Sequence, residues 1–325
     1  MDREHEEMQF LGVFGIFKES YKLIFSCRKI FTNITLALIL PLSFIYLVHV
    51  QVSSVFSRNI IHKNYEKLSD LIFHEWIYLW FFNVVYFSVF FVFSLPSTAA
   101  VVYTIAGIYT GRELTFNKIM SFVPKIWKRL LVNFSSINAA MFIYQIVALV
   151  VLFIWSISVG QLAIMGDEVL AILVILIIVG LLHLTTIWHL AGIVTVLEET
   201  IGFPAMVKSK NLVKGKLWLA VPIFVILNLA MWLHHIAFQG LVVEGTTMGL
   251  ANRVVYAIIC FLLLSITILF GLEIQTVIYF VCKSYHHENI DKSVLSDRMD
   301  TYLLRGYSPL KANDVQLFHV ILVRT

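Results

Sequence analysis

The amino-acid sequence predicts an all-α integral membrane protein with six transmembrane helices. Hydrophobic residues make up 59% of the 325-residue chain and charged residues only 14%, a balance outside the usual range of soluble globular domains. The chain also contains six apolar stretches long enough to cross a bilayer, and its Lys and Arg residues are distributed unevenly between these stretches. Lipid, and not water, is therefore expected to surround most of the chain.

The six predicted spans follow from length and composition. A helix needs about 20 mostly apolar residues to cross about 30 Å of hydrocarbon, and its backbone polar groups must be paired within the helix. The stretches that meet this requirement are residues 31–51, 76–110, 134–157, 169–197, 217–239 and 254–282. We expect an amphipathic N-terminal segment (1–30), a membrane domain (31–282) and a C-terminal tail (283–325).

The positions of Lys and Arg predict the orientation. With six spans, all but four of the 24 Lys and Arg residues lie on one side; the exceptions are Arg58, Lys63, Lys67 and Arg253. Because Lys and Arg concentrate in cytosolic loops, we expect both termini in the cytosol. The plasma membrane and the endomembranes both remain open as the location.

A threefold internal repeat is also predicted, in which each unit contains a basic amphipathic segment followed by two spans. The three segments carry apolar stripes at helical spacing. These stripes are Phe10, Phe14, Phe17, Tyr21 and Ile24 in the first, Ile119, Phe122, Ile126 and Leu130 in the second, and Met206, Val213 and Leu217 in the third. Because each unit contains two spans, the units are expected to be parallel repeats.

The amphipathic segments have two possible environments. They can lie in the inner headgroup layer, where each basic residue gains about 1 kcal/mol from anionic lipid, or their stripes can pack on the protein itself. We favour the first environment, which makes anionic inner-leaflet headgroups the predicted partner.

Short strings along the chain resemble known families. The alternation of basic amphipathic segments with paired spans is similar to membrane domains attached to some glycerophosphodiester phosphodiesterases. The strings Leu40–Phe44, Lys283–Asn289 and Tyr307–Lys311 resemble a plant family of uncharacterised multi-pass membrane proteins, and this similarity extends over the full length. Neither resemblance implies an activity or catalytic residues.

Glu273, in the last span, is the centre of a candidate intramembrane polar site. A carboxylate at the centre of a membrane helix costs roughly 2.5–3.5 kcal/mol, so it should be partnered or protonated. His189 in the fourth span falls at a similar depth, and we predict that the two side chains approach each other, with Gln275 and His183 as further members. A His–Glu pair suits a proton relay or a substrate site, or simply a bond between two helices.

Pro96, near the middle of the second span, is a candidate kink. Proline removes one backbone donor and frees the carbonyl four residues earlier, at Val92. The span is also about 35 residues long, well beyond the need of a straight helix. It is predicted either to line a cavity at the kink or to tilt and extend into the cytosol.

Motifs that would identify an enzyme or a metal protein were sought along the chain. The sequence contains no Gly-rich phosphate loop, nucleophile elbow, paired-histidine zinc helix or Cys cluster. We therefore assign no catalytic residue, cofactor or metal ligand, and leave open whether the chain is an enzyme. The basic residues follow a membrane face, which argues against nucleic acid as a partner.

Three function classes remain. We favour a non-enzymatic membrane scaffold or trafficking-related protein, with the tail available to a protein partner. The alternatives are a small-solute transporter or channel and an intramembrane lipid-modifying enzyme. A water-accessible cavity that contains Glu273 would favour transport. The oligomeric state is left open.

Overall fold

The computed structural model describes residues 8–64, 70–159, 166–198, 200–245 and 249–286, and its regular elements are helices. In chain order they are α2 (Val13–Ser26), α3 (Arg28–Ile34), the π-helical turn η1 (Thr35–Ile39), α4 (Leu40–Asn64), α5 (Asp70–Thr110), α6 (Phe116–Val159), α7 (Gly166–Leu197), α8 (Phe203–Val213), α9 (Leu217–Phe238), the π-helical turn η2 (Gln239–Val243) and α10 (Leu250–Tyr285). From the predicted tail, only the residues up to His286 fall within the described part.

Six helices are long and apolar enough to cross a membrane, as the sequence predicts. They cover Arg28–Phe56, Phe81–Thr110, Phe116–Ile157, Glu168–Leu197, Leu217–Val243 and Leu250–Tyr285. Several are apolar on every side, a pattern typical of helices that lipid surrounds. These six helices therefore indicate an integral multi-pass membrane protein.

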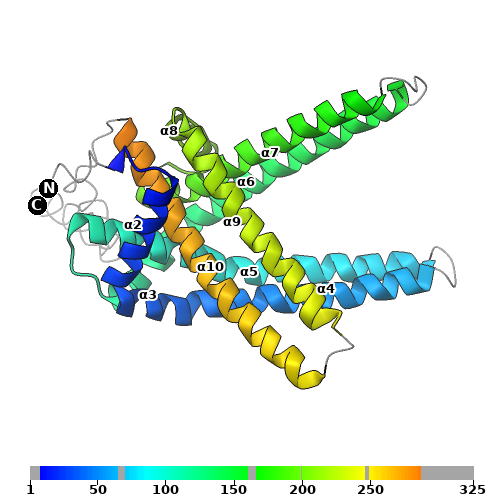
Figure 1. Cartoon of the computed structure of the whole chain (residues 1–325), viewed down its shortest axis with the longest axis horizontal. Coiled ribbons are helices and arrows are strands. Elements are labelled where there is room, and N and C mark those ends of the chain that lie inside the picture. The colour runs from blue at the N-terminus through cyan, green and yellow to red at the C-terminus, as the bar shows by residue number, and fades with distance from the viewer. Residues whose placement is uncertain (1–7, 65–69, 160–165, 199, 246–248, 287–325) are drawn as a thin grey trace, which may run out of the picture.

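The spans form three hairpins, α4/α5, α6/α7 and α9/α10, which diverge from one end of the molecule (Figure 1). We call that end the base; α2, α3, α8 and the last turns of α10 lie there. The main hydrophobic core is located at the base and includes Phe31, Ile126, Phe224 and Tyr279. The first and last described helices, α2 and α10, contact each other in this region.

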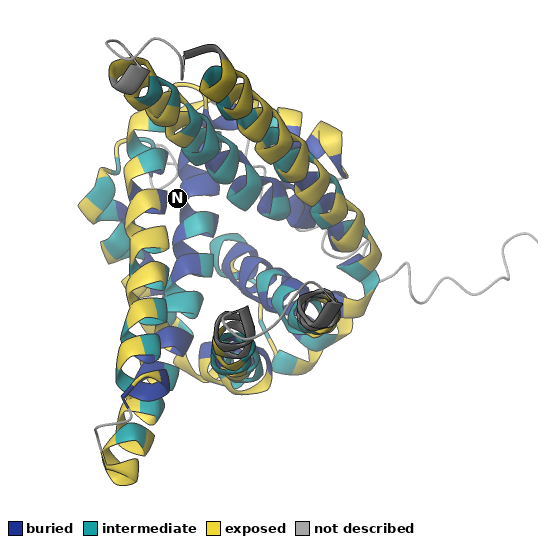
Figure 2. Ribbon diagram, turned by 90° about the vertical axis from the view of Figure 1, so that its right-hand side faces the viewer, coloured by how far each residue is buried: buried dark blue, intermediate teal, exposed yellow. Residues whose placement is uncertain are grey.

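The hairpins differ in how much they contact the rest of the molecule. Leu47 and Val50 of α4 form a second core with Phe238 of α9 and Leu264 of α10, so these two hairpins cross in contact. The α6/α7 hairpin has no buried residue among its described positions between 138 and 185. Figure 2 shows the buried positions in the interior, with exposed positions along the outer helix faces. Within the described part of the chain, the buried residues of the α6/α7 hairpin thus lie toward the base.

The three amphipathic segments have different environments in the structure. In the first segment part of the aromatic stripe faces outward: Phe14 of α2 is 89% exposed and Phe10, just before α2, is 80% exposed. Phe17 of the same stripe is half-buried and packs against the main core. The second segment is not a separate helix, because α6 continues through Pro124 from Phe116 to Val159, and its stripe is fully packed on the protein, as Ile126 illustrates. In the third, α8, Met206 and Val213 are likewise buried. The parallel threefold repeat itself stays a prediction.

Candidate functional site at the base of the bundle

A buried carboxylate, Glu198, lies directly after α7 at the base and is only 3% exposed. Its Oε1 accepts hydrogen bonds from Tyr279 Oη at 2.7 Å and from Lys283 Nζ at 3.0 Å, both on α10. Its Oε2 forms an ion pair with Lys208 of α8. A second contact, from Lys283 Nζ to Tyr279 Oη at 3.2 Å, closes the network. The Glu198 cluster, as we call these four residues, therefore ties α7 to α8 and α10.

Electrostatics at this cluster keep Glu198 ionised. Burial by itself raises the pKa of this carboxyl, but hydrogen bonds from Lys208 and Tyr279 and the charge of Lys283 outweigh burial, so the pKa lies below its usual value of 4.5. Opposite charges and hydrogen bonds to the carboxylate both favour its charged form. The cluster is thus a structural ion-pair network at the edge of a predicted span.

Two further bonds attach the neighbouring helices to the same place. Arg129 of α6 donates from its guanidinium to the backbone carbonyl of Glu198 at 2.9 Å. Ser209 of α8, which is fully buried, donates from its hydroxyl to the carbonyl of Ile187 in α7 at 2.9 Å. The turn before α8 depends on Gly202, whose φ of 68° and ψ of −134° suit glycine alone. These contacts fix α8 against the ends of α6, α7 and α10.

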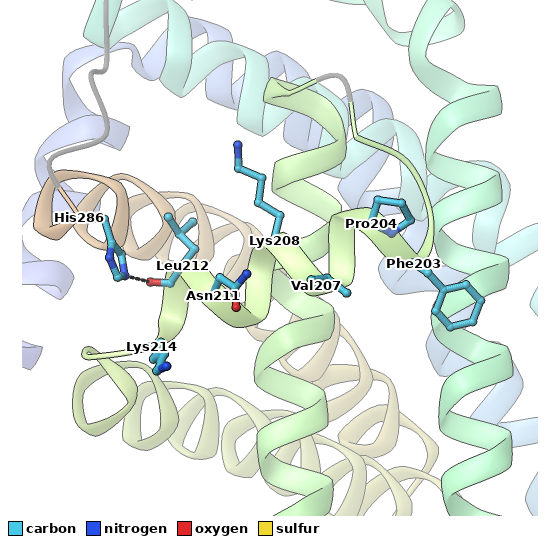
Figure 3. Close-up of a pocket in the computed structure, with 8 residues that line it drawn as sticks. All are labelled: Phe203, Pro204, Val207, Lys208, Asn211, Leu212, Lys214 and His286. Atoms are coloured by element: carbon cyan, nitrogen blue, oxygen red, sulfur yellow. Dashed lines mark hydrogen bonds between the residues drawn. The ribbon is translucent and has the colours of Figure 1, made fainter.

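A groove of about 830 Å³ lies along α8, beside the Glu198 cluster. Figure 3 shows its lining, which comes from α8, the turn that follows it and the end of α10. The lining residues are Phe203, Pro204, Val207, Lys208, Asn211, Leu212, Lys214 and His286. The imidazole Nε2 of His286 donates to the carbonyl of Leu212 at 3.0 Å, which holds the end of α10 against α8.

The structure brings together two members of the predicted intramembrane site. The side chain of Gln275 of α10 lies beside His189, whose ring stacks on Phe224 of α9 with 4.9 Å between centroids. A small cavity of about 170 Å³ adjoins both residues and also touches Asn228. His189 and Gln275 thus form a contact between α7 and α10, with α9 beside it.

Glu273 does not take part in that contact. It is fully buried, and neither carboxylate oxygen has a hydrogen-bond partner among the described residues. Residues two apart on a helix point about 200° apart, so the face of α10 that presents Gln275 to His189 turns Glu273 to the other side. The approach of Glu273 to His189 stays a prediction.

His183 and Pro96, the remaining candidates, lie apart from these contacts. His183 is half-buried on α7, six residues before His189. Pro96 is buried within α5, which continues unbroken from Asp70 to Thr110. The hydroxyl of Ser97 donates to the carbonyl of Phe93 at 2.7 Å, which supplies a donor in the turn where proline perturbs the backbone pairing. Pro96 does not line the groove along α8, the cavity beside His189 or a third cavity beside His49.

Sequence reasoning missed two polar clusters. One is the Glu198 cluster, whose available signal was an acidic residue at the end of a span followed by a lysine-rich helix. The other lies toward the far end of the bundle from the base, where the imidazole of His49 contacts Asn83 Oδ1 at 3.0 Å and stacks on Tyr86. That cluster borders a cavity of about 330 Å³, which also touches Arg58 and His235. No local pattern marks it, because its members come from different helices.

Comparison with known proteins gives a family but no activity. No curated protein and no solved structure matches the chain. One family model, described as a domain of unknown function (DUF8558), matches residues 1–320. The family therefore covers the N-terminal segment, all six candidate spans and most of the tail, and the chain belongs to the DUF8558 family.

Proposed function

We propose that this protein is a non-enzymatic membrane scaffold that gathers anionic lipids of the inner leaflet around its base. The observation that carries the proposal is an exposed aromatic surface made by Phe10, just before α2, and by two rings of α2, Phe14 and Tyr21. Phe10, Phe14 and Tyr21 are all more than half exposed, although aromatic rings of this size gain about 1.5–3 kcal/mol each when removed from water. These rings are therefore more stable when shielded from water, and the headgroup–acyl boundary of a membrane would shield them.

The arrangement of faces on α2 suits a helix lying in a membrane surface. Ile16 and Leu23 are buried against the protein. Phe14 and Tyr21 project away from them, and the exposed Lys18 and Lys22 lie beside these rings. Helices with an aromatic face and adjacent basic residues bind in the interfacial layer of anionic membranes.

The position of α2 also supports the proposal. The helix ends one residue before α3, with which the first candidate span begins at Arg28. In Figure 1, α2 runs across the base, crosswise to α4 and α5. Lys216 Nζ, close to the start of α9, donates to the carbonyl of Gln9 at 2.8 Å and anchors the chain just before α2. A helix fixed crosswise to a span at its end is suited to the membrane surface.

The transport alternative has less support. It predicts a cavity that contains Glu273, and none of the three cavities described above includes this residue. The cavity beside His189 is small, about 170 Å³, below the usual size of a ligand pocket.

The first test asks whether lipid covers the stripe. In a variant with Cys27, Cys260 and Cys282 replaced by Ala, a spin label is placed at Phe14→Cys or at Lys22→Cys, which lies further round α2 with its side chain 75% exposed, and the protein is reconstituted in anionic vesicles. We expect the label at residue 14 to be reached by oxygen and not by a water-soluble nickel chelate, and the label at residue 22 to show the reverse. Equal access of the chelate to both positions would contradict the proposal.

The second test measures lipid gathering. The double variant Phe10→Ser/Phe14→Ser should lower the enrichment of a fluorescent anionic lipid around the reconstituted protein to less than half. The matched control is Phe142→Ser, which changes an exposed ring of α6, 63% accessible, in the outer part of the hairpin. Enrichment that is equal in both variants would assign the effect to the protein as a whole and not to α2.

A further inference from the structure

We propose that the groove along α8 binds one anionic phospholipid, with the headgroup phosphate at its Lys214 end and the glycerol–acyl region at its Phe203 end. The inference builds on the proposed function, because it assumes that the base lies at the inner leaflet. It goes further by assigning a discrete site for one lipid, distinct from the diffuse attraction of α2.

The chemistry of the groove changes along its length. Figure 3 shows His286, Lys214 and Asn211 toward one end, and Phe203 and Pro204 toward the other. Phe203 and Val207 are each more than half exposed. They lie one helical turn apart and therefore on the same side of α8. A molecule with a charged head and an apolar body matches this gradient, whereas a fully polar solute would leave the apolar end uncovered.

The charge of the groove is complementary to phosphate. Its lining contains no Asp or Glu, and of its two lysines Lys208 is paired with Glu198, so Lys214 supplies the charge. The ammonium group of Lys214 is exposed and makes no hydrogen bond or ion pair within the described ranges of the chain. Asn211, one turn earlier on α8, adds an amide donor at the same end. Hydrogen bonds from a charged donor to phosphate are about twice as strong as those between neutral groups.

The walls of the groove are held in place before any ligand arrives. The Glu198 cluster fixes Lys208, the buried Ser209 bonds α8 to α7, and His286 fixes the end of α10 on Leu212. Since neither wall has to be ordered upon binding, most of the interaction with a headgroup contributes to affinity. The volume of about 830 Å³ is within the range of small-molecule sites, enough for a phosphoglycerol group and the first acyl carbons.

The test titrates phosphatidic acid, whose headgroup is the bare phosphate, into the detergent-solubilised full-length protein and counts bound lipid by native mass spectrometry. We expect one saturable lipid per protein, and an apparent Kd about tenfold weaker in Lys214→Gln. The matched control is Lys210→Gln, which removes an exposed lysine of the same helix outside the lining and should leave the Kd unchanged. Val207→Ser should weaken the binding of phosphatidic acid and leave the binding of inorganic phosphate unchanged.

Several results would overturn the proposal. They are an unchanged Kd in Lys214→Gln, an equal loss in Lys210→Gln, or inorganic phosphate that displaces the lipid at similar concentrations. The last result would identify the groove as a site for free phosphate. The Phe10→Ser/Phe14→Ser variant separates this inference from the proposed function, because in detergent it should retain the single lipid. If α2 proves to be exposed to water while this lipid still binds, the proposed function is wrong but the assignment of the groove as a lipid site stands.

Discussion

Among individual residues, Glu198 illustrates how a buried charge is accommodated at the base. Its carboxylate is paired with Lys208 and Lys283 and accepts a further bond from Tyr279. A well-packed apolar group in place of such a network can be equally stable, but removal of Glu198 leaves Lys283, whose side chain is only 14% exposed, without its compensating charge. The network therefore makes the relative placement of α7, α8 and α10 dependent on one side chain.

We predict that Glu198→Gln destabilises the protein by about 3–5 kcal/mol, because it removes the charge that compensates two lysines. Thermal unfolding in detergent, followed by circular dichroism, measures the change. Glu113→Gln serves as the control, since Glu113 is exposed just after α5 and its loss should cost less than about 0.5 kcal/mol. Similar unfolding temperatures for the two variants would show that the cluster has no stabilising role.

The depressed pKa of Glu198 predicts that the folded protein loses stability in acid. Because the folded protein holds this carboxyl below its usual pKa of 4.5, the stabilisation is complete above that pH and is lost as the pH falls below it. We expect the stability difference between the unmodified protein and Glu198→Gln to shrink between about pH 7 and pH 3. Denaturant unfolding at a series of pH values would show this, and a constant difference would argue against an ionised Glu198.

At the scale of elements, the turn between α7 and α8 determines where α8 lies. Gly202 has φ 68° there, and an added Cβ would meet the Ser136 hydroxyl oxygen of α6 at 3.0 Å. The backbone conformation and the close neighbour both require glycine. Gly202 thus allows the turn that leads into α8, and the Glu198 cluster and Ser209 hold the helix there.

Gly202→Ala should therefore cost about 1–3 kcal/mol through backbone strain. Gly192→Ala is the control, because Gly192 lies inside α7 with open space where an added Cβ would lie, and alanine there should gain about 0.5–1 kcal/mol. Differential scanning fluorimetry in detergent compares the two. An unchanged unfolding temperature in Gly202→Ala would mean that the turn accepts alanine without strain.

Amphipathic periodicity in the sequence identified stripes but not what covers them. Phe14 and Ile126 belong to stripes with the same spacing, yet Phe14 faces outward and Ile126 is buried in the core. The difference depends on which helices pack nearby, and local spacing contains no information about that. For the same reason, spacing did not show that the second segment and the third span form one helix, α6, which continues through Pro124.

At the scale of the whole molecule, the spans were predictable because the bilayer imposes a length and an apolar composition on each helix separately. The Glu198 cluster was not, because its members come from three separate segments and meet only after the helices pack. Of the predicted intramembrane site, His189 and Gln275 line the same small cavity. The approach of Glu273 to His189 stays a prediction.

The uneven distribution of the core gives a prediction for the whole molecule. Ile126→Ala, in the base core, should cost about 2–5 kcal/mol through the lost contacts and the cavity. Ile154→Ala, in the outer part of the α6/α7 hairpin where Ile154 is 57% exposed, should change the free energy of unfolding by less than about 0.5 kcal/mol. Unfolding in mixed micelles measures both, and equal losses would indicate that the outer hairpin packs on another part of the molecule.

The α6/α7 hairpin has a mechanical consequence. Since positions 138–185 contribute no buried side chain within the described part, a change in the inclination of this hairpin exchanges lipid for lipid and leaves the core intact. Helices adjust to thicker or thinner bilayers by tilting at a cost of fractions of a kcal/mol per Å. Because α6 runs unbroken from the packed base to Val159, bending of this helix above the base is the motion that would let the outer hairpin follow local membrane thickness.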